Sequence, residues 1–514
     1  MSFQISNLLK PEVFTHPVEQ LELVETHISW VILTGQYAYK IKKPVNFGFL
    51  DFSTLEKRKN LCEQEVRLNR RLAQSVYLAV VPVTGRPEKP VVDGEGEAFE
   101  YAVKMSQFPQ SAQLDHMLEA GELQLEHVDA LANLVASFHQ SAQVANHEQR
   151  FGDSELVKYP VDENFRQIRE HLDTDEYEAD LVLLEQWSDT EFIKLKDTIQ
   201  QRKQDGFVRE CHGDMHLRNL VWIDNQPMAF DCIEFNPSLS WIDVISEIAF
   251  LIMDLHSRNQ QGLANRFLNG YLEATGDYPG LKLLHFYLSY RALVRAKVSV
   301  LRLGQTDLSE EEKQQVKTEF EQYLHLALNY IQTKKPQIIL MQGFSASGKS
   351  TVSQKIIDHS SVIRIRSDVE RKRLFNKINQ PDSKETINEG IYNPRVSEKV
   401  YQFLSEQVQV ITGSGFSVIV DAAFLKYWQR EIFQQLASSL NVSYTILQLV
   451  ASENVLRKRI VQRKKSVSDA DLTVLEYQLD NWQPFLPNEV SSVITVDTEK
   501  NLDVNQLLKQ LVLK

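Results

Sequence analysis

The segment at residues 343–350, Gly-Phe-Ser-Ala-Ser-Gly-Lys-Ser, constrains the possible folds of this chain more than any other. It directly follows the apolar run 338–341. This pattern is typical of a loop between a buried strand and a helix, where backbone N–H groups and the helix N-terminus cradle phosphates. In such a loop Lys349 reaches the β- and γ-phosphates and Ser350 binds magnesium. The predicted phosphate-binding residues are Gly343, Ser345, Ala346, Ser347, Gly348, Lys349, Ser350 and Thr351.

The chain after this loop alternates between strand-like and helix-like segments. The strand-like runs are 338–341, 362–365, 417–420, 444–450 and 493–496. Such alternation predicts a parallel sheet covered by helices on both faces, with ligands at the carboxyl ends of the strands. We therefore expect an α/β P-loop NTPase domain over residues 335–514.

Two acidic residues of this domain follow predicted strands. Asp368 comes just after the run 362–365, which makes it a candidate base for an acceptor hydroxyl. Asp421 ends a Walker B-like strand and would help to hold the metal. Arg459 and Arg463 share one face of a predicted helix and would close over the transferring phosphoryl group. The alternative is that this Lys/Arg-rich run is a solvated helix face.

A second signature lies at residues 212–219, His-Gly-Asp-Met-His-Leu-Arg-Asn. Asp214 and Asn219 have the separation found in a kinase catalytic loop. Asp231 follows the apolar run 227–230 and would supply a further metal ligand. Since phosphoryl transfer needs a carboxylate for the hydroxyl proton and ligands for magnesium, the sequence predicts a second kinase-like site.

This stretch resembles the H-G-D-x-H-x-x-N motif of the aminoglycoside phosphotransferase-like kinases, in which an apolar strand ending in Asp follows. The resemblance implies that Asp214 is the catalytic base and that Asn219 and Asp231 bind magnesium. It also implies that His216 orders the loop. The fold implied for residues 1–334 is an α+β bilobal, protein-kinase-like one.

The same resemblance implies a strand-borne lysine that contacts the α- and β-phosphates. Lys40 is preferred, and Lys42 stays open because it lies on the same face of a strand. The helix partner of this lysine would be Glu65, with Glu63 as the weaker option. Residues 105–108 occupy the place of the adenine-binding hinge.

One departure from the protein-kinase pattern follows Asp231, where Cys232, Ile233 and Glu234 stand in place of Phe-Gly. This favours the small-molecule phosphotransferases, which often lack that glycine. Glu234 is either an extra metal or substrate ligand or a surface acid. Asp243 matches a position that such kinases use to brace the catalytic loop.

The second half resembles small P-loop kinases that include zeta toxins, chloramphenicol phosphotransferase and gluconate kinase. The stretch Ser367-Asp368-x-x-x-Arg371 is nearest to the zeta-toxin and chloramphenicol phosphotransferase pattern. Together the halves look like the bacterial proteins described as bifunctional aminoglycoside phosphotransferase and ATP-binding protein. We place the boundary at residues 333–336, where Thr-Lys-Lys-Pro breaks a helical pattern and precedes the first strand of the second half.

Composition narrows the setting of the protein. A chain of 514 residues with a net charge of −13 has the length of two or more domains and lacks the basic balance of a nucleic-acid binder. Cys62, Cys211 and Cys232 are too scattered for a disulfide framework or a zinc site, so we expect a reducing cytoplasm and interpret Cys211 and Cys232 as small buried side chains. The apolar run 248–253 is too short to span a membrane. Oligomeric state is left open.

The sequence therefore predicts an ATP- and Mg²⁺-dependent phosphotransferase with tandem kinase modules and a small-molecule hydroxyl acceptor. Two alternatives stay open: a nucleotide-binding switch with one inactive half, or a nucleic-acid end kinase acting through the P-loop half. The net negative charge argues against the second alternative, because nucleic-acid binders are usually basic.

Overall fold

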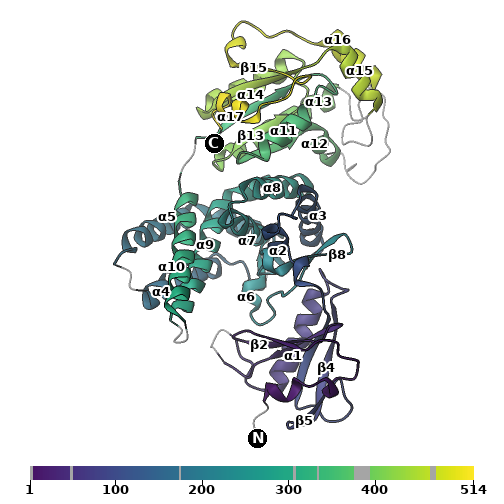
Figure 1. Ribbon diagram of the computed structural model, residues 1–514. Helices are drawn as coiled ribbons and strands as arrows, with labels where there is room; N and C mark the ends of the chain where they lie inside the picture. Colours follow the sequence, from purple (N-terminus) through teal and green to yellow (C-terminus); the bar gives the residue numbers. More distant parts are fainter. Residues whose placement is uncertain are drawn as a thin grey trace.

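The computed structural model describes residues 4–46, 50–146, 148–172, 175–304, 308–332, 335–374, 394–462 and 471–513 (Figure 1). A sheet-rich lobe at the N-terminal end is followed by a helical lobe and then by an α/β domain at the C-terminal end (Figure 1). No helix in these ranges is long and apolar enough to cross a membrane.

The first lobe is a six-stranded antiparallel sheet in the order β1-β2-β3-β6-β4-β5. The strands are β1 (Glu22–Glu25), β2 (Ser29–Leu33), β3 (Tyr37–Lys42), β4 (Tyr77–Arg86), β5 (Lys89–Val92) and β6 (Glu100–Ser106). Strands β2 and β3 form a hairpin around the turn at Gly35. Helix α1 (Leu55–Asn69) buries Cys62 and Val66 against one face of this sheet. Its N-cap is Thr54, whose hydroxyl accepts a hydrogen bond from the Lys57 N–H.

The second lobe is mainly helical, because long segments repeat apolar residues at helical spacing. Its main helices are α2 (Leu114–Glu119), α3 (Leu125–Ser141), α4 (Ser154–His171), α5 (Glu178–Gln204), α7 (Val244–Ser257), α8 (Gln261–Thr275), α9 (Leu281–Leu303) and α10 (Glu310–Tyr330). Between α5 and α7 lie the short strands β7 (Val208–Glu210), β8 (Leu220–Ile223), β9 (Gln226–Ala229) and β10 (Trp241–Asp243), together with helix α6 (Pro237–Ser240). The predicted catalytic loop, residues 212–219, connects β7 to β8.

The third part contains a five-stranded, fully parallel sheet in the order β12-β13-β11-β14-β15, as the alternating pattern predicted. Its strands are β11 (Gln337–Gln342), β12 (Val362–Arg366), β13 (Ser417–Asp421), β14 (Ser443–Val450) and β15 (Val493–Asp497). Its helices are α11 (Lys349–Ile357), α12 (Ser367–Leu374), α13 (Pro394–Gly413), α14 (Tyr427–Leu440), α15 (Glu453–Gln462), α16 (Leu472–Asn481) and α17 (Val504–Gln510). One face of the sheet packs on α11 and α17, and the other packs on α13 and α14.

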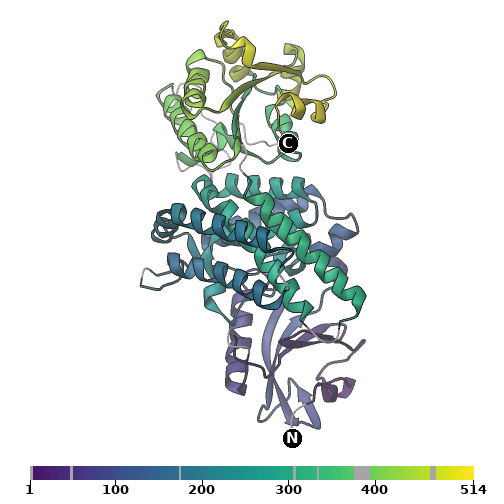
Figure 2. The ribbon, with the colours of Figure 1, turned by 90° about the vertical axis from the view of Figure 1, so that its left-hand side faces the viewer.

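The α/β domain rests on the helical lobe through helix α8, as both views show (Figures 1 and 2). Helix α8 contacts the edge strand β12 and helix α11. Buried apolar side chains form one continuous cluster across this junction, from Phe267 and Leu268 on α8 to Ile363 and Ile365 on β12. The edge of the sheet is therefore covered by the preceding lobe.

Candidate active sites

Five charged side chains line up between β3, α1 and the segment after β9. The Lys40 ammonium lies 2.9 Å from a Glu65 carboxylate oxygen and also pairs with Asp231. The Lys42 ammonium lies 2.6 Å from the other Glu65 oxygen and pairs with Glu234. Lysines two apart on a strand point to the same side, so both reach one glutamate on the helix opposite. The order is Asp231, Lys40, Glu65, Lys42, Glu234, with alternating charge.

Burial and neighbouring charge set the protonation of this cluster. Burial alone would lower the pKa of Lys40, but Asp231 and Glu65 raise it well above its ordinary value. Burial would raise the pKa of Glu65, yet the two ammonium groups lower it to about 2. Burial raises the pKa of Glu234 despite Lys42. Glu234 is only 5% exposed, so it is not the surface acid that the sequence left open.

The predicted loop brings Asp214, His216 and Asn219 together. The Asn219 side-chain amide donates to the Asp214 carboxylate and to its backbone carbonyl, both at 3.0 Å. His216 Nε2 lies 3.4 Å from an Asp214 carboxylate oxygen. Burial acts to raise the pKa of Asp214, but His216 and His212 lower it below its ordinary value. The carboxylate is therefore held ionised, while 37% of the side chain is exposed.

The segment that carries Asp231 is fixed to this loop and to α1. A ring nitrogen of His212 lies 2.8 Å from the carbonyl oxygen of Phe230, and the Phe230 N–H donates to the Asn219 carbonyl. Asp231 has a positive φ of 63°, a backbone conformation that Asp tolerates better than most residues. Its side chain is 46% exposed. These contacts place the predicted base and the predicted metal ligands in one site.

Helix α7 braces the loop through two residues that the sequence analysis did not single out. The buried Glu247 carboxylate accepts the backbone N–H groups of His212 at 2.6 Å and Gly213 at 2.8 Å. Asp254 accepts the Leu217 N–H at 2.9 Å. The signal was present, because these two acids flank the apolar run 248–253 of a buried helix.

Asp243, which the resemblance implied as the brace, has a different place. It pairs with Arg202 at 2.7 Å, and its carboxylate caps α7 by accepting the Ile245 N–H. Arg202 also pairs with Asp277 at 2.7 Å. Asp243 therefore stabilises the start of the bracing helix, and the bonds to the loop come from further along that helix.

All three cysteines are buried, as expected for Cys211 and Cys232. The sequence showed no ligand partner for Cys211, but the fold brings it close to His139 and Glu247, with their potential ligand atoms within 4.8 Å of one another. His139 Nε2 lies 3.7 Å from a Glu247 oxygen, and Glu247 already accepts two backbone N–H groups. We therefore interpret His139, Cys211 and Glu247 as a structural cluster that supports the loop.

The second site is a pocket of about 750 Å³ at the carboxyl ends of the parallel strands. The loop 343–350 forms one wall, and the Lys349 ammonium donates to the carbonyls of Gly343 and Phe344 at 2.9 and 2.8 Å. Ala346 and Gly348 adopt positive φ, of 61° and 92°, which bends the loop before α11. All the predicted phosphate-binding residues except Gly343 and Ser347 line the pocket directly.

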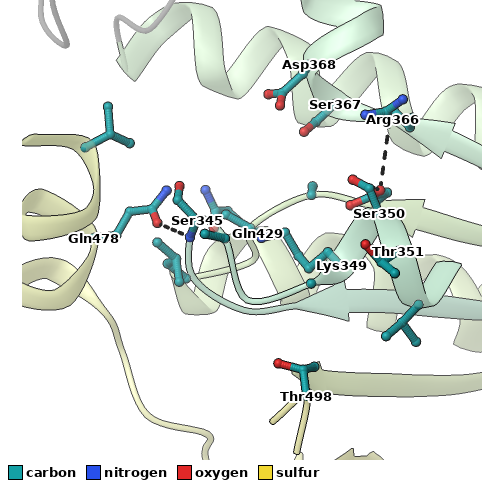
Figure 3. Close-up of a pocket in the computed structure, with 18 of the residues that line it drawn as sticks. Ser345, Lys349, Ser350, Thr351, Arg366, Ser367, Asp368, Gln429, Gln478 and Thr498 are labelled. Atoms are coloured by element: carbon teal, nitrogen blue, oxygen red, sulfur yellow. Dashed lines mark hydrogen bonds and ion pairs between the residues drawn. The ribbon is translucent and has the colours of Figure 1, made fainter. Parts of the chain in front are cut away.

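Asp421 and Asp368 both face this pocket, from different strand ends. The Ser350 hydroxyl donates to Asp421 at 3.1 Å, which places the two predicted metal ligands together. Figure 3 shows Asp368 and Ser367 across the pocket from Lys349 and Ser345. Arg366, which precedes them, lies with its Nε 4.0 Å from the Asp421 carboxylate.

The two arginines expected to close over the transferring phosphoryl group are Arg459 and Arg463. Arg459 lines the pocket, but its guanidinium donates to Thr498 and, at 3.3 Å, to the Ala346 carbonyl. Arg463 lies outside the described residues. Gln478 of α16, which the sequence did not single out, accepts the Ser345 N–H at 2.7 Å (Figure 3).

Comparisons with known proteins agree with both folds. Residues 51–284 match the model of the phosphotransferase enzyme family, and residues 338–485 match a model described as an AAA domain. Uncharacterized protein Rv2004c of Mycobacterium tuberculosis and Uncharacterized protein Mb2027c of Mycobacterium bovis are each 30% identical over 459 residues, covering 88% of this chain and 89% of theirs.

The chain is thus a tandem of an aminoglycoside phosphotransferase-like domain and a P-loop kinase-like domain, and it belongs to the same family as these mycobacterial proteins. Solved structures with similarity to single parts include amicoumacin kinase, at 14% identity and a TM-score of 0.39 over 60% of this chain and 88% of that one. A gluconokinase from Sinorhizobium meliloti has 20% identity and a TM-score of 0.26 over 35% of this chain and 97% of that one.

Proposed function

We propose that this protein is an ATP- and Mg²⁺-dependent phosphotransferase in which each domain transfers a γ-phosphoryl group to a hydroxyl of a small molecule. One observation carries the proposal: each domain gathers into one site a candidate base, a lysine and a second carboxylate that could hold a metal. Positioning and charge compensation are the main demands of phosphoryl transfer, and these sets supply both.

At the first site Asp214 would take the hydroxyl proton. The low pKa of its carboxyl keeps the group ionised, which is the form that can accept a proton. Asn219 and His216 fix the orientation of the carboxylate. Asn219 and Asp231 offer oxygen ligands of the kind Mg²⁺ prefers, and Lys40, aligned by Glu65, would bind phosphate oxygens. When MgATP is bound, ATP supplies the phosphoryl group, and Mg²⁺ compensates the negative charge of the phosphates.

At the second site the residues also fit a magnesium nucleotide. The loop backbone and Lys349 would hold the phosphates, and the Ser350–Asp421 pair would hold the metal. Asp368 would accept the proton of a hydroxyl that enters from the opposite side of the pocket. Arg459, tied to the loop at Ala346, would steady the nucleotide side.

The test is transfer of label from γ-labelled ATP to a bacterial small-molecule extract by the full chain. We expect labelled products that disappear in an Asp214→Asn, Asp368→Asn double variant, with each single variant losing a different subset. Lys349→Ala should remove nucleotide binding at the second site alone, since the phosphates lose their main counter-ion. Products that survive the double variant would contradict the assignment.

The same assay separates the alternatives for the P-loop half. A kinase loses acceptor-dependent ADP release in Asp368→Asn and keeps its ATP affinity within a few-fold. A switch keeps both slow hydrolysis and any nucleotide-dependent conformational signal in that variant. Labelling of a 5′-hydroxyl oligonucleotide added in parallel would instead identify a nucleic-acid end kinase.

A further inference from the structure

A residue of the first domain reaches the edge of the second site. Glu273, on helix α8, accepts hydrogen bonds from Arg366 at 3.0 Å and from Arg364 at 3.2 Å. Both arginines come from β12, the edge strand of the parallel sheet. Arg366 lines the pocket, directly before Ser367 and Asp368. Its side chain is 15% exposed and that of Glu273 is 24% exposed, so the pair is largely shielded from water.

The surrounding contacts fix Glu273 in this position. Asn269, one turn earlier on α8, pairs with the β12 backbone through both ends of its amide: it donates to the Val362 carbonyl at 3.0 Å and accepts the Arg364 N–H at 2.7 Å. Tyr278 donates to Glu370 of α12 at 3.3 Å. Helix α8 therefore pairs with the edge strand β12 in a defined register.

Arg366 lies between carboxylates of the two domains. On one side is Glu273, and on the other is Asp421, whose nearest oxygen is 4.0 Å from the Arg366 Nε. That Asp421 oxygen is the same one that accepts the Ser350 hydroxyl. Figure 3 shows the Arg366 contact beside Ser350. An arginine that moved closer would form a direct pair with Asp421 and compete with a cation for it.

We propose that Glu273 is a positioning residue of the second site: it holds Arg366 away from Asp421, so that the carboxylate stays available to Mg²⁺. This rests on the proposed function of the P-loop site, and it makes the first domain part of that site's construction. Without the Glu273 charge, Asp421 and Asp368 are the remaining carboxylates that act on Arg366.

The experiment compares full-length Glu273→Gln with the unmodified chain by Mg²⁺ titration of fluorescent mant-ATP binding and of ADP release. Only the component that disappears in Lys349→Ala is assigned to the second site. We expect the Mg²⁺ concentration for half-maximal signal to rise about fivefold or more in both measurements. The first-site component should keep its Mg²⁺ dependence.

Two further variants separate positioning from general loss of the interface. Asp358→Asn removes another contact with α8, the pair with Arg266 at 3.4 Å, and should leave the Mg²⁺ midpoint within twofold. Glu273→Gln should add no further shift in an Arg366→Ala chain, because it acts through that arginine.

Equal midpoints in Glu273→Gln and the unmodified chain would overturn the inference, as would a shift that Asp358→Asn reproduces or that persists with Arg366→Ala. If Lys349→Ala leaves binding and ADP release unchanged, the proposed function of the site fails, and this inference fails with it.

Discussion

Individual carboxylates of the first site have pKa values shifted in different directions because their neighbours differ. Glu65 lies between two ammonium groups, which hold it ionised in a buried place. Asp214 is held ionised by histidines, whereas burial raises the pKa of Glu234. The ionised form is thus favoured most strongly at Glu65, which would align the phosphate-binding lysine, and at Asp214, which would take a proton.

We predict that Asp214→Ala lowers turnover at the first site by about a hundredfold or more, since a general base acts on the chemical step. Nucleotide binding at that site should change little, because Lys40 and Asp231 are untouched. Product formation and mant-ATP affinity, measured on the same preparation, check the two halves of this statement. Wild-type turnover in this variant would remove Asp214 from the catalytic role.

The buried Glu65 gives a pH-dependent prediction. Its pKa falls from an ordinary 4.5 to about 2 in the folded chain, so its stabilising contribution is present above about pH 4.5 and is lost as pH falls towards 2. Glu65→Gln leaves two buried ammonium groups short of a partner and should cost about 3–5 kcal/mol at pH 7. Urea unfolding at pH 7, 5 and 4 should show the gap to wild type narrowing below pH 4.5.

Glu63→Gln is the matched control for that measurement. Glu63 lies on the same helix, is 52% exposed and only approaches Lys59 at 3.9 Å, so its loss should change stability little at any pH. A pH-independent gap for Glu65→Gln, or an equal effect of Glu63→Gln, would contradict the assigned role.

At the residue scale, the sequence predicted which types of side chain each site needs. It could not always show which of two neighbouring residues of the same type takes the role. The motif spacing predicted that Asp214 and Asn219 share a site, and the apolar run before Asp231 added that residue as a candidate ligand. Lys40 and Lys42 could not be separated, because they share a strand face and both reach Glu65. Only the fold shows that Glu234 pairs with Lys42, which leaves Asp231 beside Lys40.

At the scale of elements, helix α7 supports the predicted catalytic loop through hydrogen bonds. It is buried and apolar along most of its length, and the carboxylates of Glu247 and Asp254 accept hydrogen bonds from backbone N–H groups of the loop. The sequence showed the apolar run 248–253, but a segment buried on all sides has no helical periodicity to identify it as a helix. The acids beside this run indicated buried polar contacts, whereas the backbone N–H groups that they bind could not be identified from local sequence.

We predict that Glu247→Gln lowers first-site turnover by about tenfold or more, since small displacements of catalytic groups are costly. An amide has one oxygen where the carboxylate has two, so one of the His212 and Gly213 N–H groups loses its acceptor, at about 1–3 kcal/mol. Thermal unfolding and turnover report the two effects. The Lys349-dependent ADP release of the same chain is the internal control and should be unchanged.

At the scale of the whole molecule, the two domains share an interface that could not be predicted from the sequence. The break at residues 333–336 predicted a boundary, and α10 ends at Tyr330 while β11 begins at Gln337. The residues that meet across it, such as Asn269 and the β12 backbone, are ordinary for a helix and an edge strand. Their pairing depends on how the domains dock, which no local pattern encodes.

Residues 335–514 should still fold alone, because α11 and α17 close a core of their own on one face of the sheet. The fragment would lack Glu273 and would expose the β12 edge. We therefore expect it to bind mant-ATP but to need more Mg²⁺ than the full chain. A fragment that is insoluble or does not bind nucleotide would show that the interface is obligatory for folding.

A close backbone approach between the domains tests the interface without altering charge. Gly262, in the first turn of α8, faces the Asp358 backbone, and a Cβ there would lie 2.4 Å from the Asp358 carbonyl oxygen. Since neither backbone can yield cheaply, Gly262→Ala should push the domains apart, shift Glu273 from Arg366 and raise the Mg²⁺ midpoint of the second site. First-site turnover should stay within about twofold, because the loop is held by Glu247 and Asp254 of α7, which the substitution does not alter. Gly413→Ala, where a Cβ meets nothing within 4 Å, is the matched control. If Gly262→Ala leaves the midpoint at the wild-type value while thermal unfolding shows a lower melting temperature, the second site does not depend on how the domains are docked.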